Sequence, residues 1–252
     1  MNYKIAIPSY KRPEQIKKWT LAYLDKCGID PSSVYIFLSN ADELQEYQES
    51  LGDVYNLVYE TDLHNLKEKH NFIVDYFDEG EHIVLFEDDI QHLVKKKTNR
   101  SQPFYDLDQF IGLGFIQLYK TNCKIFGVTP TANGFYMANK YGKCFKVIAG
   151  YFFGFINDKR IKVNISSKHD YERTILHHIN FGGVVRFDML GQASSSFTNP
   201  GGLQSQYDSE ARKIEELETN RYLLTTYPTY VAKRNRPNKI LGGVTELRLL
   251  RQ

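Results

Sequence analysis

Three adjacent carboxylates, Glu87, Asp88 and Asp89, come directly after the apolar run HIVLF at residues 82–86. Neighbouring acids repel one another, and core packing gives no reason to place them at the end of a strand. In an extended segment residues i and i+2 face the same way, so Glu87 and Asp89 can point at one site. Two hard oxygen ligands suit Mg²⁺ or Mn²⁺, with diphosphate oxygens completing the coordination. The alternative is a polar strand end or the acidic first turn of a helix.

A second acidic cluster lies in the segment SSKHDYE at residues 166–172, just before an apolar helical pattern. Ser167 and Asp170 have the spacing of a capping box, and Glu172 lies where an acid favours the first turn of a helix. The pattern is therefore typical of a helix start. A carboxylate at an exposed helix end can also act as a base, so both roles stay open.

Polar loops follow the first two predicted strands, at residues 3–8 and 34–38. The first loop, PSYKRP at residues 8–13, combines a ring that can stack on a base, a hydroxyl and two cations that can bind phosphates. The second carries Ser39, Asn40 and Asp42, which can bind a base or a ribose. The same three residues are equally typical of a helix N-cap.

The elements that position these groups alternate regularly. Strand-like runs at residues 3–8, 34–38, 55–59 and 82–86 are separated by helical patterns at 13–27, 41–51 and 66–77. This alternation predicts an α/β fold with a mostly parallel, doubly wound sheet. Such sheets bind ligands beyond the carboxyl ends of their strands, which is where the acidic triplet and the polar loops fall.

After residue 90 the pattern is weaker. We expect helices over residues 103–118, 168–179 and 207–224, and strands within 144–156, over 160–165 and over 184–187. Residues 188–205 show no periodicity and are expected to form a loop. The chain has no internal repeat and no linker, so we expect one domain spanning residues 1–252.

The composition excludes several classes of protein. With 252 residues, 42% hydrophobic and 25% charged, the chain is typical of a globular domain and not of a collagen-like, coiled-coil or disordered one. No apolar run approaches the roughly 20 residues that span a bilayer, and the N-terminus lacks the pattern of a signal peptide. Three widely spaced cysteines form no metal knuckle or disulfide framework. We therefore expect a cytoplasmic protein without a membrane partner.

Glycine-rich nucleotide loops are absent from the sequence. The first half has neither G-x-G-x-x-G nor G-x-x-x-x-G-K-[ST], which argues against a classical dinucleotide fold and a P-loop enzyme. The net charge of +2 is low for a strongly cationic nucleic-acid binder. Basic clusters at residues 95–100 and 233–236 are either phosphate-contacting patches or solvated turns.

The order of these segments resembles the nucleotide-sugar half of GT-A glycosyltransferases. The resemblance rests on IAIPSYKRPEQI at residues 5–16, LSNADE at 38–43, HNLKEKHNFIVDYF at 64–77 and IVLFEDDI at 83–90. It covers residues 3–90 well and 145–180 loosely. It implies a GT-A type fold with a nucleotide-sugar half over residues 1–100 and an acceptor half over 101–252.

The resemblance also implies ligands. The D-x-D motif of the family is matched by Glu87-Asp88-Asp89, with Glu in place of the first Asp, so Asp89 and Glu87 are expected to hold Mn²⁺ or Mg²⁺. The residues expected to bind the UDP-sugar are Pro8, Ser9, Tyr10, Arg12, Asn40, Asp42, Lys69, Asn71 and Asp88.

The catalytic base is implied in the same way. Many GT-A enzymes carry an acidic pair after a segment of glycines and aromatics, here residues 150–154, and one of the acids takes the acceptor proton. Asp170 is the first choice for this base and Glu172 the second. A late histidine often adds a metal ligand, but His177 and His178 point about 100° apart on a helix, so at most one could serve. Surface or core histidines are the alternative.

The acceptor is implied by a narrower resemblance. The runs IPSYKRPEQI, FEDDI and HDYE and the compact length look similar to phage glycosyltransferases of hydroxymethylpyrimidine DNA, the TET/JBP-associated group. This implies duplex DNA with 5-hydroxymethylpyrimidines as partner, a flipped target base, and a location in the host cytoplasm. The two basic clusters would bind phosphates, and residues 194–206 would line the acceptor or form a surface loop.

Two other functions stay open. One is a GT-A enzyme that builds a cell-surface glycan, and the other is a non-catalytic DNA-binding module on the same scaffold. The sequence leaves the donor sugar, the anomeric outcome and the oligomeric state undetermined.

Overall fold

A central mixed sheet organises the chain in the computed structural model, which describes residues 2–61, 63–194, 209–237 and 245–250. Its strands are β1 (Lys4–Pro8), β2 (Val34–Leu38), β3 (Asn56–Tyr59), β4 (His82–Phe86), β7 (Ile125–Val128), β8 (Tyr141–Cys144), β9 (Phe152–Ile156) and β10 (Val184–Phe187). They lie in the order β3-β2-β1-β4-β9-β7-β10-β8. Only β8 and β9 run against the other strands of this sheet, so the predicted α/β fold with a mostly parallel sheet is confirmed.

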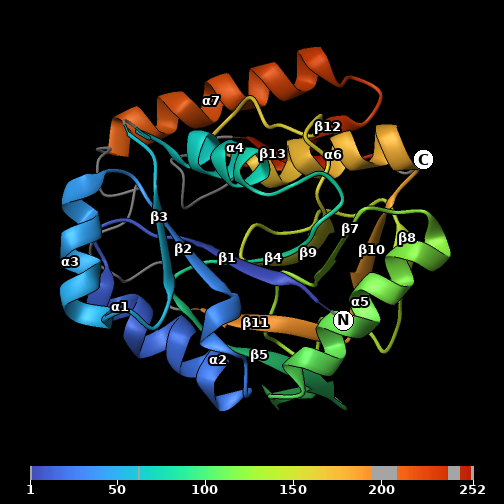
Figure 1. The fold of residues 1–252 in the computed structure, drawn as a ribbon. Helices are drawn as coiled ribbons and strands as arrows, with labels where there is room; N and C mark the ends of the chain where they lie inside the picture. Colours follow the sequence, from blue (N-terminus) through green and yellow to red (C-terminus); the bar gives the residue numbers. More distant parts are fainter. Residues whose placement is uncertain (1, 62, 195–208, 238–244, 251–252) are drawn as a thin grey trace.

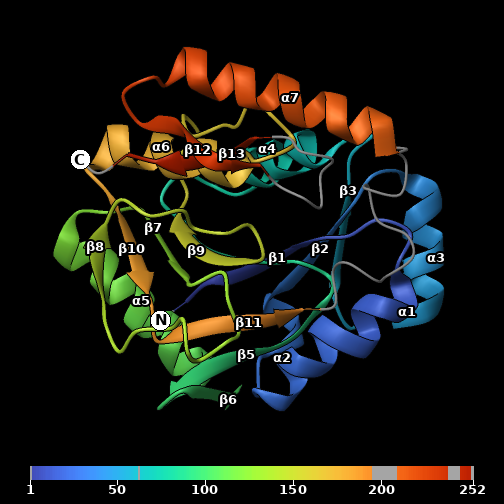
Figure 2. The same cartoon turned by 180° about the vertical axis from the view of Figure 1, so that it is seen from behind.

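Helices cover both faces of this sheet (Figures 1 and 2). On one side lie α1 (Pro13–Ile16), the π-helical turn Lys17–Leu21, α2 (Ala22–Lys26), the short 3₁₀ turn Pro31–Ser33, α3 (Ala41–Leu51) and α5 (Leu107–Thr121). On the other lie α4 (Leu66–Tyr76) and α6 (His169–Phe181), with α7 (Ser209–Thr226) outermost. In β1, Ile5 and Ile7 pack into the first core and Ala6 into the second. Burial on both faces explains why β1 is a continuous apolar run.

Two smaller sheets complete the structure. The strands β11 (Leu190–Ser194), β5 (Ile90–Lys97) and β6 (Arg100–Phe104) pair in that order, and β5 begins directly after the acidic triplet. The strands β12 (Val231–Pro237) and β13 (Thr245–Leu249) pair with each other and pack on α6 and α7. The segment after the triplet therefore leads straight into a hairpin on the surface of the molecule.

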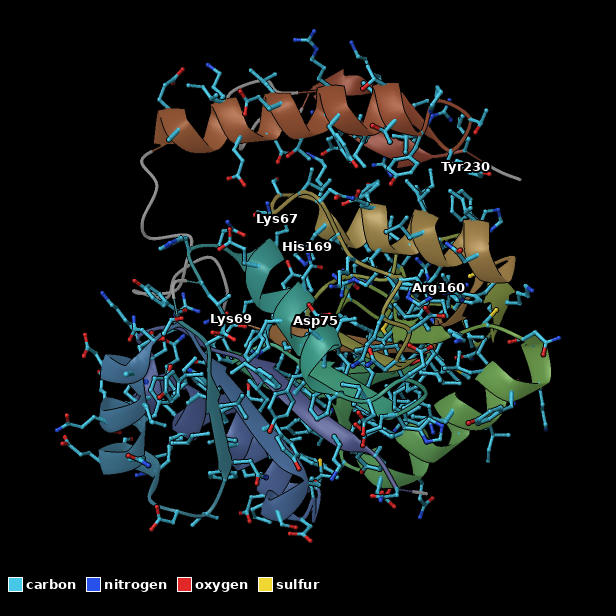
Figure 3. All side chains as sticks on the ribbon, turned by 45° about the horizontal axis from the view of Figure 1, so that its top comes forward. Lys67, Lys69, Asp75, Arg160, His169 and Tyr230 are labelled. Carbon is cyan, nitrogen blue, oxygen red and sulfur yellow. The ribbon has the colours of Figure 1, made fainter. Side chains whose placement is uncertain are left out.

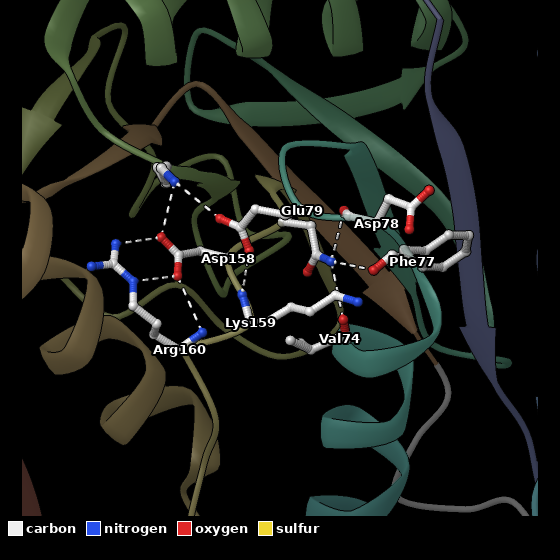
Figure 4. Close-up of polar contacts among 9 residues, drawn as sticks. Val74, Phe77, Asp78, Glu79, Asp158, Lys159 and Arg160 are labelled. Carbon is white, nitrogen blue, oxygen red and sulfur yellow. Dashed lines mark hydrogen bonds and ion pairs between the residues drawn. The ribbon is translucent and has the colours of Figure 1, made fainter.

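The turn after β9 ties the end of α4 to the sheet (Figure 4). The amide of Asn157 donates to the carbonyls of Val74, Phe77 and Asp78 at 2.9–3.1 Å. Next to it, the Asp158 carboxylate accepts two hydrogen bonds from the Arg160 guanidinium, at 2.8 and 2.7 Å, and one from the Arg160 N–H at 3.1 Å. This turn sets the position of α4, which carries Lys69 toward the candidate site.

One predicted helix begins later than expected, and one predicted strand is absent. The helix expected over residues 103–118 begins later, because Pro103 belongs to β6 and pairs with Val94. The strand expected over residues 160–165 is absent. Its backbone is bonded to side chains instead: Asn71 pairs with both the N–H and the C=O of Val163, at 3.0 and 2.8 Å.

Two further expectations need correction at their boundaries. Residues 145–151, inside the strand-like run 144–156, have no strand structure, and β9 holds only the last five residues. The loop expected over 188–205 contains β11 at its start, paired with β5. The local pattern did not indicate β11, because its partner strand β5 lies far away along the chain.

The close packing of Gly114 on Phe126 generates a stability prediction. A Cβ on Gly114 would lie 2.4 Å from the Phe126 ring, which is fully buried, whereas a Cβ on Gly112 in the same helix would meet nothing within 4 Å. We expect Gly114→Ala to lower the free energy of unfolding by about 1–3 kcal/mol through overpacking. Gly112→Ala, the matched control, should raise it by up to about 1 kcal/mol through helix propensity. Urea denaturation measures both, and equal effects of the two variants would contradict the packing argument.

Candidate functional site

A pocket of about 280 Å³ opens at the carboxyl ends of β1 and β4. The residues that line it are Pro8, Ser9, Tyr10, Arg12, Leu66, Lys69, Glu87, Asp88, Asp89, Gly150, Tyr151, Ser166, Ser167, Lys168, His169 and Asp170. They come from the loop after β1, from α4, from the acidic triplet after β4, from the turn before β9 and from the start of α6. The fold thus brings both acidic clusters of the sequence and the first polar loop to one place.

A buried glutamate, Glu43 of α3, connects the loops that follow β1 and β2. Its carboxylate accepts the N–H of Lys11 at 2.8 Å and the N–H of Ser39 at 2.6 Å. Asn40 caps α3 by accepting the N–H of Glu43 at 2.9 Å, and Asp42 is exposed. Neither Asn40 nor Asp42 lines the pocket, and the N-cap interpretation of Asn40 is the one that the structure shows.

Asp88 joins the acidic triplet to the loop after β1. Its carboxylate accepts hydrogen bonds from the Ser9 hydroxyl at 2.7 Å and from the Arg12 guanidinium at 3.2 Å. Ser9 also bonds the hydroxyl of Tyr47 at 2.6 Å. Burial raises the pKa of Asp88, and the Arg12 guanidinium acts in the opposite direction. Asp88 therefore holds the loop after β1, which lines the pocket, in a fixed position.

Lys69 fastens the same loop from the opposite side. Its ammonium group is fully buried and donates to the carbonyl of Ser9 at 2.5 Å, with the Tyr10 ring centroid 5.7 Å away. Burial lowers the pKa of Lys69 to about 8, while Glu43 and Asp88 act to raise it. Figure 3 shows Lys69 on α4 and His169 at the start of α6.

Glu87 and His169 approach each other across Gly150. A Cβ added to Gly150 would lie 3.1 Å from Nε2 of His169 and 3.7 Å from Oε1 of Glu87. The other ring nitrogen of His169, Nδ1, lies 2.8 Å from the carbonyl of Ser166, so the proton sits on Nδ1 and the Nε2 lone pair is left for another partner. Among the described residues Nε2 has no hydrogen-bond partner.

The protonation of this pair follows from its burial. Burial lowers the pKa of His169 to about 3, which keeps the imidazole neutral at physiological pH. Burial raises the pKa of Glu87 to about 8, with a smaller contribution from the negative charges of Asp89 and Asp88. A divalent cation would remove this penalty by supplying positive charge, so the site has an electrostatic demand for one.

Asp170 lies at the start of α6 and faces the pocket. The predicted capping box does not form: Lys168 is the N-cap residue, in a left-handed conformation with φ 51°, and the Ser167 hydroxyl donates to Glu216 of α7 at 2.5 Å. Burial raises the pKa of Asp170, and the Arg173 guanidinium acts to lower it. Left-handed backbone at a non-glycine residue carries strain, which often marks functional sites.

Arg173, one turn after Asp170, is a functional candidate that sequence reasoning missed. Its guanidinium is buried, lies 4.0 Å from the ring centroid of Phe153, and interacts electrostatically with Asp170 and Glu87. It thus supplies positive charge beneath both carboxylates. A lone arginine on the apolar face of a helix, three residues from the expected base, was the available signal.

Glu172 and Asn71 do not line the pocket. Glu172 is fully buried, and its carboxylate accepts the N–H of Asn164 at 2.6 Å and the hydroxyls of Tyr222 at 2.8 Å and Tyr227 at 3.2 Å. Asn71 is bonded to the backbone of Val163, as described above. Both side chains hold the segment between β9 and α6 in place.

Two histidines expected as alternative metal ligands also lie elsewhere. His177 faces a small cavity under α4 and α6, and His178 packs on Phe145 with ring centroids 4.1 Å apart. In the basic cluster at residues 233–236, Arg234 forms an ion pair with Glu246 at 3.2 Å. The expected acceptor loop, residues 194–206, lies outside the described residues beyond Ser194.

The residues of the pocket fit a hard divalent cation. Glu87 and Asp89 offer carboxylate oxygens, and His169 offers a neutral imidazole nitrogen aimed into the same space. In the described part of the chain no three such side chains are close enough to enclose an ion by themselves. Sites for Mg²⁺ commonly use one or two carboxylates and leave the remaining positions to substrate phosphates.

The raised pKa of Glu87 generates a pH prediction. Because the pKa of Glu87 is about 8 in the folded chain and an ordinary glutamate has a pKa of 4.5, the folded state binds this proton more tightly than the unfolded state. The free energy of unfolding of the metal-free protein should therefore decrease as the pH rises from about 4.5 to about 8. Glu87→Gln removes the fall and should be more stable by about 1–4 kcal/mol above pH 8, with no difference near pH 4.

Urea denaturation in EDTA across this range measures the effect. The control is Glu46→Gln, which changes an exposed acid on α3 and should follow the wild type at every pH. If Glu87→Gln follows the wild type as well, Glu87 is not the source of the pH dependence.

Comparisons with known proteins bear on the fold. No family model and no curated protein matches the sequence. Solved structures do: glucosyl-3-phosphoglycerate synthase from Mycobacterium tuberculosis, solved with Mn²⁺, UDP and glucosyl-3-phosphoglycerate, has a TM-score of 0.50 at 8% identity, covering 99% of this chain and 87% of that one. Within the described part of the chain, no helix has the length and apolar character needed to span a bilayer.

Two further structures are similar at lower scores. A nucleotide-diphospho-sugar transferase from Desulfovibrio desulfuricans has a TM-score of 0.44 at 14% identity, covering 73% of this chain and 78% of that one. HddC from Yersinia pseudotuberculosis has a TM-score of 0.38 at 10% identity, covering 64% and 79%. The match to the synthase extends over almost the whole chain, and it shows that this protein has a GT-A type fold.

Proposed function

We propose that this protein is a metal-dependent glycosyltransferase that moves a sugar from a UDP-sugar to the hydroxymethyl group of a 5-hydroxymethylpyrimidine in DNA. One observation carries the proposal: the acidic triplet, the polar loop after β1 and Asp170 meet in one pocket at the carboxyl ends of β1 and β4. In α/β sheets of this kind, that edge is where ligands bind. The whole chain acts as a single domain in this proposal.

The donor binds between the loop after β1 and the acidic triplet. Tyr10 offers a ring for the uracil, and Arg12 offers positive charge to the phosphates. The solved synthase of the same fold holds Mn²⁺ and UDP, which supports this class of donor. Lys69 and Asp88 act by fixing the loop that carries Tyr10 and Arg12.

Glu87 and Asp89 would hold Mn²⁺ or Mg²⁺ together with diphosphate oxygens, and His169 presents Nε2, which has no hydrogen-bond partner among the described residues, to the same pocket. When bound, the ion neutralises negative charge on the diphosphate as the UDP leaves. Gly150 permits the approach of His169 to Glu87, because a side chain there would meet the imidazole. The backbone of the triplet is fixed by Thr20, which donates to the carbonyl of Glu87 at 2.7 Å and accepts the N–H of Ile90 at 3.0 Å.

Asp170 takes the proton of the acceptor hydroxyl as its oxygen attacks the anomeric carbon. The bond from that carbon to the UDP oxygen breaks, and UDP leaves with the bonding electrons. A base must be ionised before it can accept a proton, and burial opposes ionisation of Asp170. Arg173 opposes this effect, because its guanidinium favours the ionised form of Asp170. Asp170 can therefore have a raised pKa, which makes it a stronger base, and still be ionised often enough to accept a proton.

The DNA acceptor is supported by the similarity of the IPSYKRPEQI, FEDDI and HDYE runs to phage enzymes that modify hydroxymethylpyrimidines. Chemistry on a base within a duplex requires that the base leave the stack, which a pocket at the rim of a sheet allows.

UDP release tests the proposed function directly. The purified protein is incubated with Mn²⁺, a panel of UDP-sugars, and duplex DNA with or without 5-hydroxymethylpyrimidines. We expect release only with the hydroxymethylated duplex and only with divalent metal. UDP release that does not depend on DNA would support glycosyl transfer but contradict the DNA acceptor, and would favour a glycan or a small molecule as acceptor. DNA binding without UDP release for any donor would contradict the enzyme and favour a non-catalytic module.

Two variants separate metal binding from base catalysis. Asp170→Asn should lower kcat by about 10²–10⁴-fold without changing the Kd for UDP, because the base acts only in the chemical step. Asp89→Ala should abolish the Mn²⁺ dependence of UDP binding, measured by calorimetry. Asp53→Asn, an exposed acid, is the control and should leave both unchanged. Full turnover in Asp170→Asn would show that another group is the base.

A further inference from the structure

Two exposed aromatic rings project beside the hairpin of β5 and β6. Phe135 and Tyr136 lie in the loop between β7 and β8 and are 67% and 73% exposed. Lys95, Lys97 and Arg100 of the hairpin are exposed as well. We call these five residues the basic aromatic surface. In Figure 2 the hairpin lies at the bottom of the molecule beside β11, on the opposite side from α7.

The loop that carries the rings is fixed to the hairpin. Lys96 of β5 donates to the carbonyl of Gly134, and a Cβ on Gly134 would come within 2.2 Å of the Arg100 backbone. The side chain of Asn133 accepts the N–H of Phe135 at 3.0 Å, which shapes the turn. The two ring centroids are 5.2 Å apart with planes at 89°. The rings are thus presented by a tethered turn, and little ordering cost remains for binding.

The sequence segments that form the basic aromatic surface contain no acidic residue. No Asp or Glu occurs from residue 90 to residue 105 or from residue 109 to residue 157. Among the described residues, Lys95, Lys97 and Arg100 form no ion pair, although Lys95 lies 5.8 Å from the ring centroid of Phe104. By contrast, Arg234 in the other basic cluster is paired with Glu246.

Unpaired cations around exposed rings match the chemistry of nucleic acid. Phosphates attract the cations, and aromatic side chains stack on bases or wedge between base steps. Strand β5 starts next to Asp89 and has eight residues, so the hairpin turn lies roughly 25 Å along the chain from the pocket. That length corresponds to about seven base pairs of duplex.

We propose that the basic aromatic surface binds duplex DNA several base pairs away from the target base, with Lys97 and Arg100 on phosphates and Phe135 or Tyr136 against a base step. The inference rests on the proposed function, since it takes a base in duplex DNA as the acceptor. In this proposal, residues outside the pocket determine where along the duplex the enzyme sits relative to the target base.

Binding of a labelled, unmodified duplex of about 20 base pairs, followed by fluorescence anisotropy at several salt concentrations, tests the proposal. The double variant Phe135→Ala/Tyr136→Ala should raise the Kd for the duplex about 10-fold or more. The dependence of its affinity on salt concentration should be unchanged. Lys97→Ala/Arg100→Ala should weaken binding and lower the slope of log K against log salt by about two. Tyr119→Ala and Lys120→Ala, which change exposed residues of α5, are controls and should bind like the wild type.

UDP affinity is measured in parallel and should be unchanged in every variant. If the wild type binds the duplex and both double variants bind it equally well, the surface is not the DNA site and the proposed function stands. If the wild type binds UDP but no duplex at any salt, the DNA acceptor and the surface both fail. If the double variants lose binding to anionic vesicles but keep DNA binding, the surface belongs to a membrane and the inference is overturned.

Discussion

The burial of negative charge at the end of β4 is the constraint on which the rest of the structure depends. Asp88 and Asp89 are only 6% and 3% exposed, and burial raises the pKa of Glu87 to about 8. Buried carboxylates are costly unless cations or hydrogen-bond donors surround them. A fold that places three of them at one strand end must therefore supply compensation from its neighbours.

That compensation comes from several elements at once. Arg12 and Ser9 reach Asp88 from the loop after β1, and Lys69 reaches the same loop from α4. Arg173 lies beneath Glu87 from α6, on the far half of the chain. Arg12, Lys69 and Arg173 add positive charge. Hydrogen bonds from Ser9, Arg12 and Lys69 also hold Asp88 and the loop after β1 in place. These cations compensate the buried carboxylates only in part, so the pocket still favours added positive charge. A divalent cation supplies that charge and can bind together with a diphosphate, which is negatively charged.

Local pattern predicted the first ninety residues well because β1, β2 and β4 are almost fully buried apolar runs and the helices α3 and α4 between the strands are amphipathic. The boundaries of β2, α3 and β4 agree with the expected ones to the residue. Prediction failed where side chains from distant segments satisfy the backbone. Residues 160–165 were expected to form a strand, yet Val163 is bonded to Asn71, which is 92 residues away in the sequence. The strand β11 pairs with β5 across a similar distance, and no local signal marks it.

The sequence by itself determined the α/β alternation, and with it the edge of the sheet where the acidic triplet and the first polar loop would meet. Only the tertiary structure decided which side chains face that edge. It turned Asp88 toward Ser9, 79 residues away, buried Glu172 against Tyr222, 50 residues away, and brought His169 to the pocket in place of His177 and His178. The physical reason is that periodicity reports burial along one element, whereas the partner of a buried charge is set by which elements pack together.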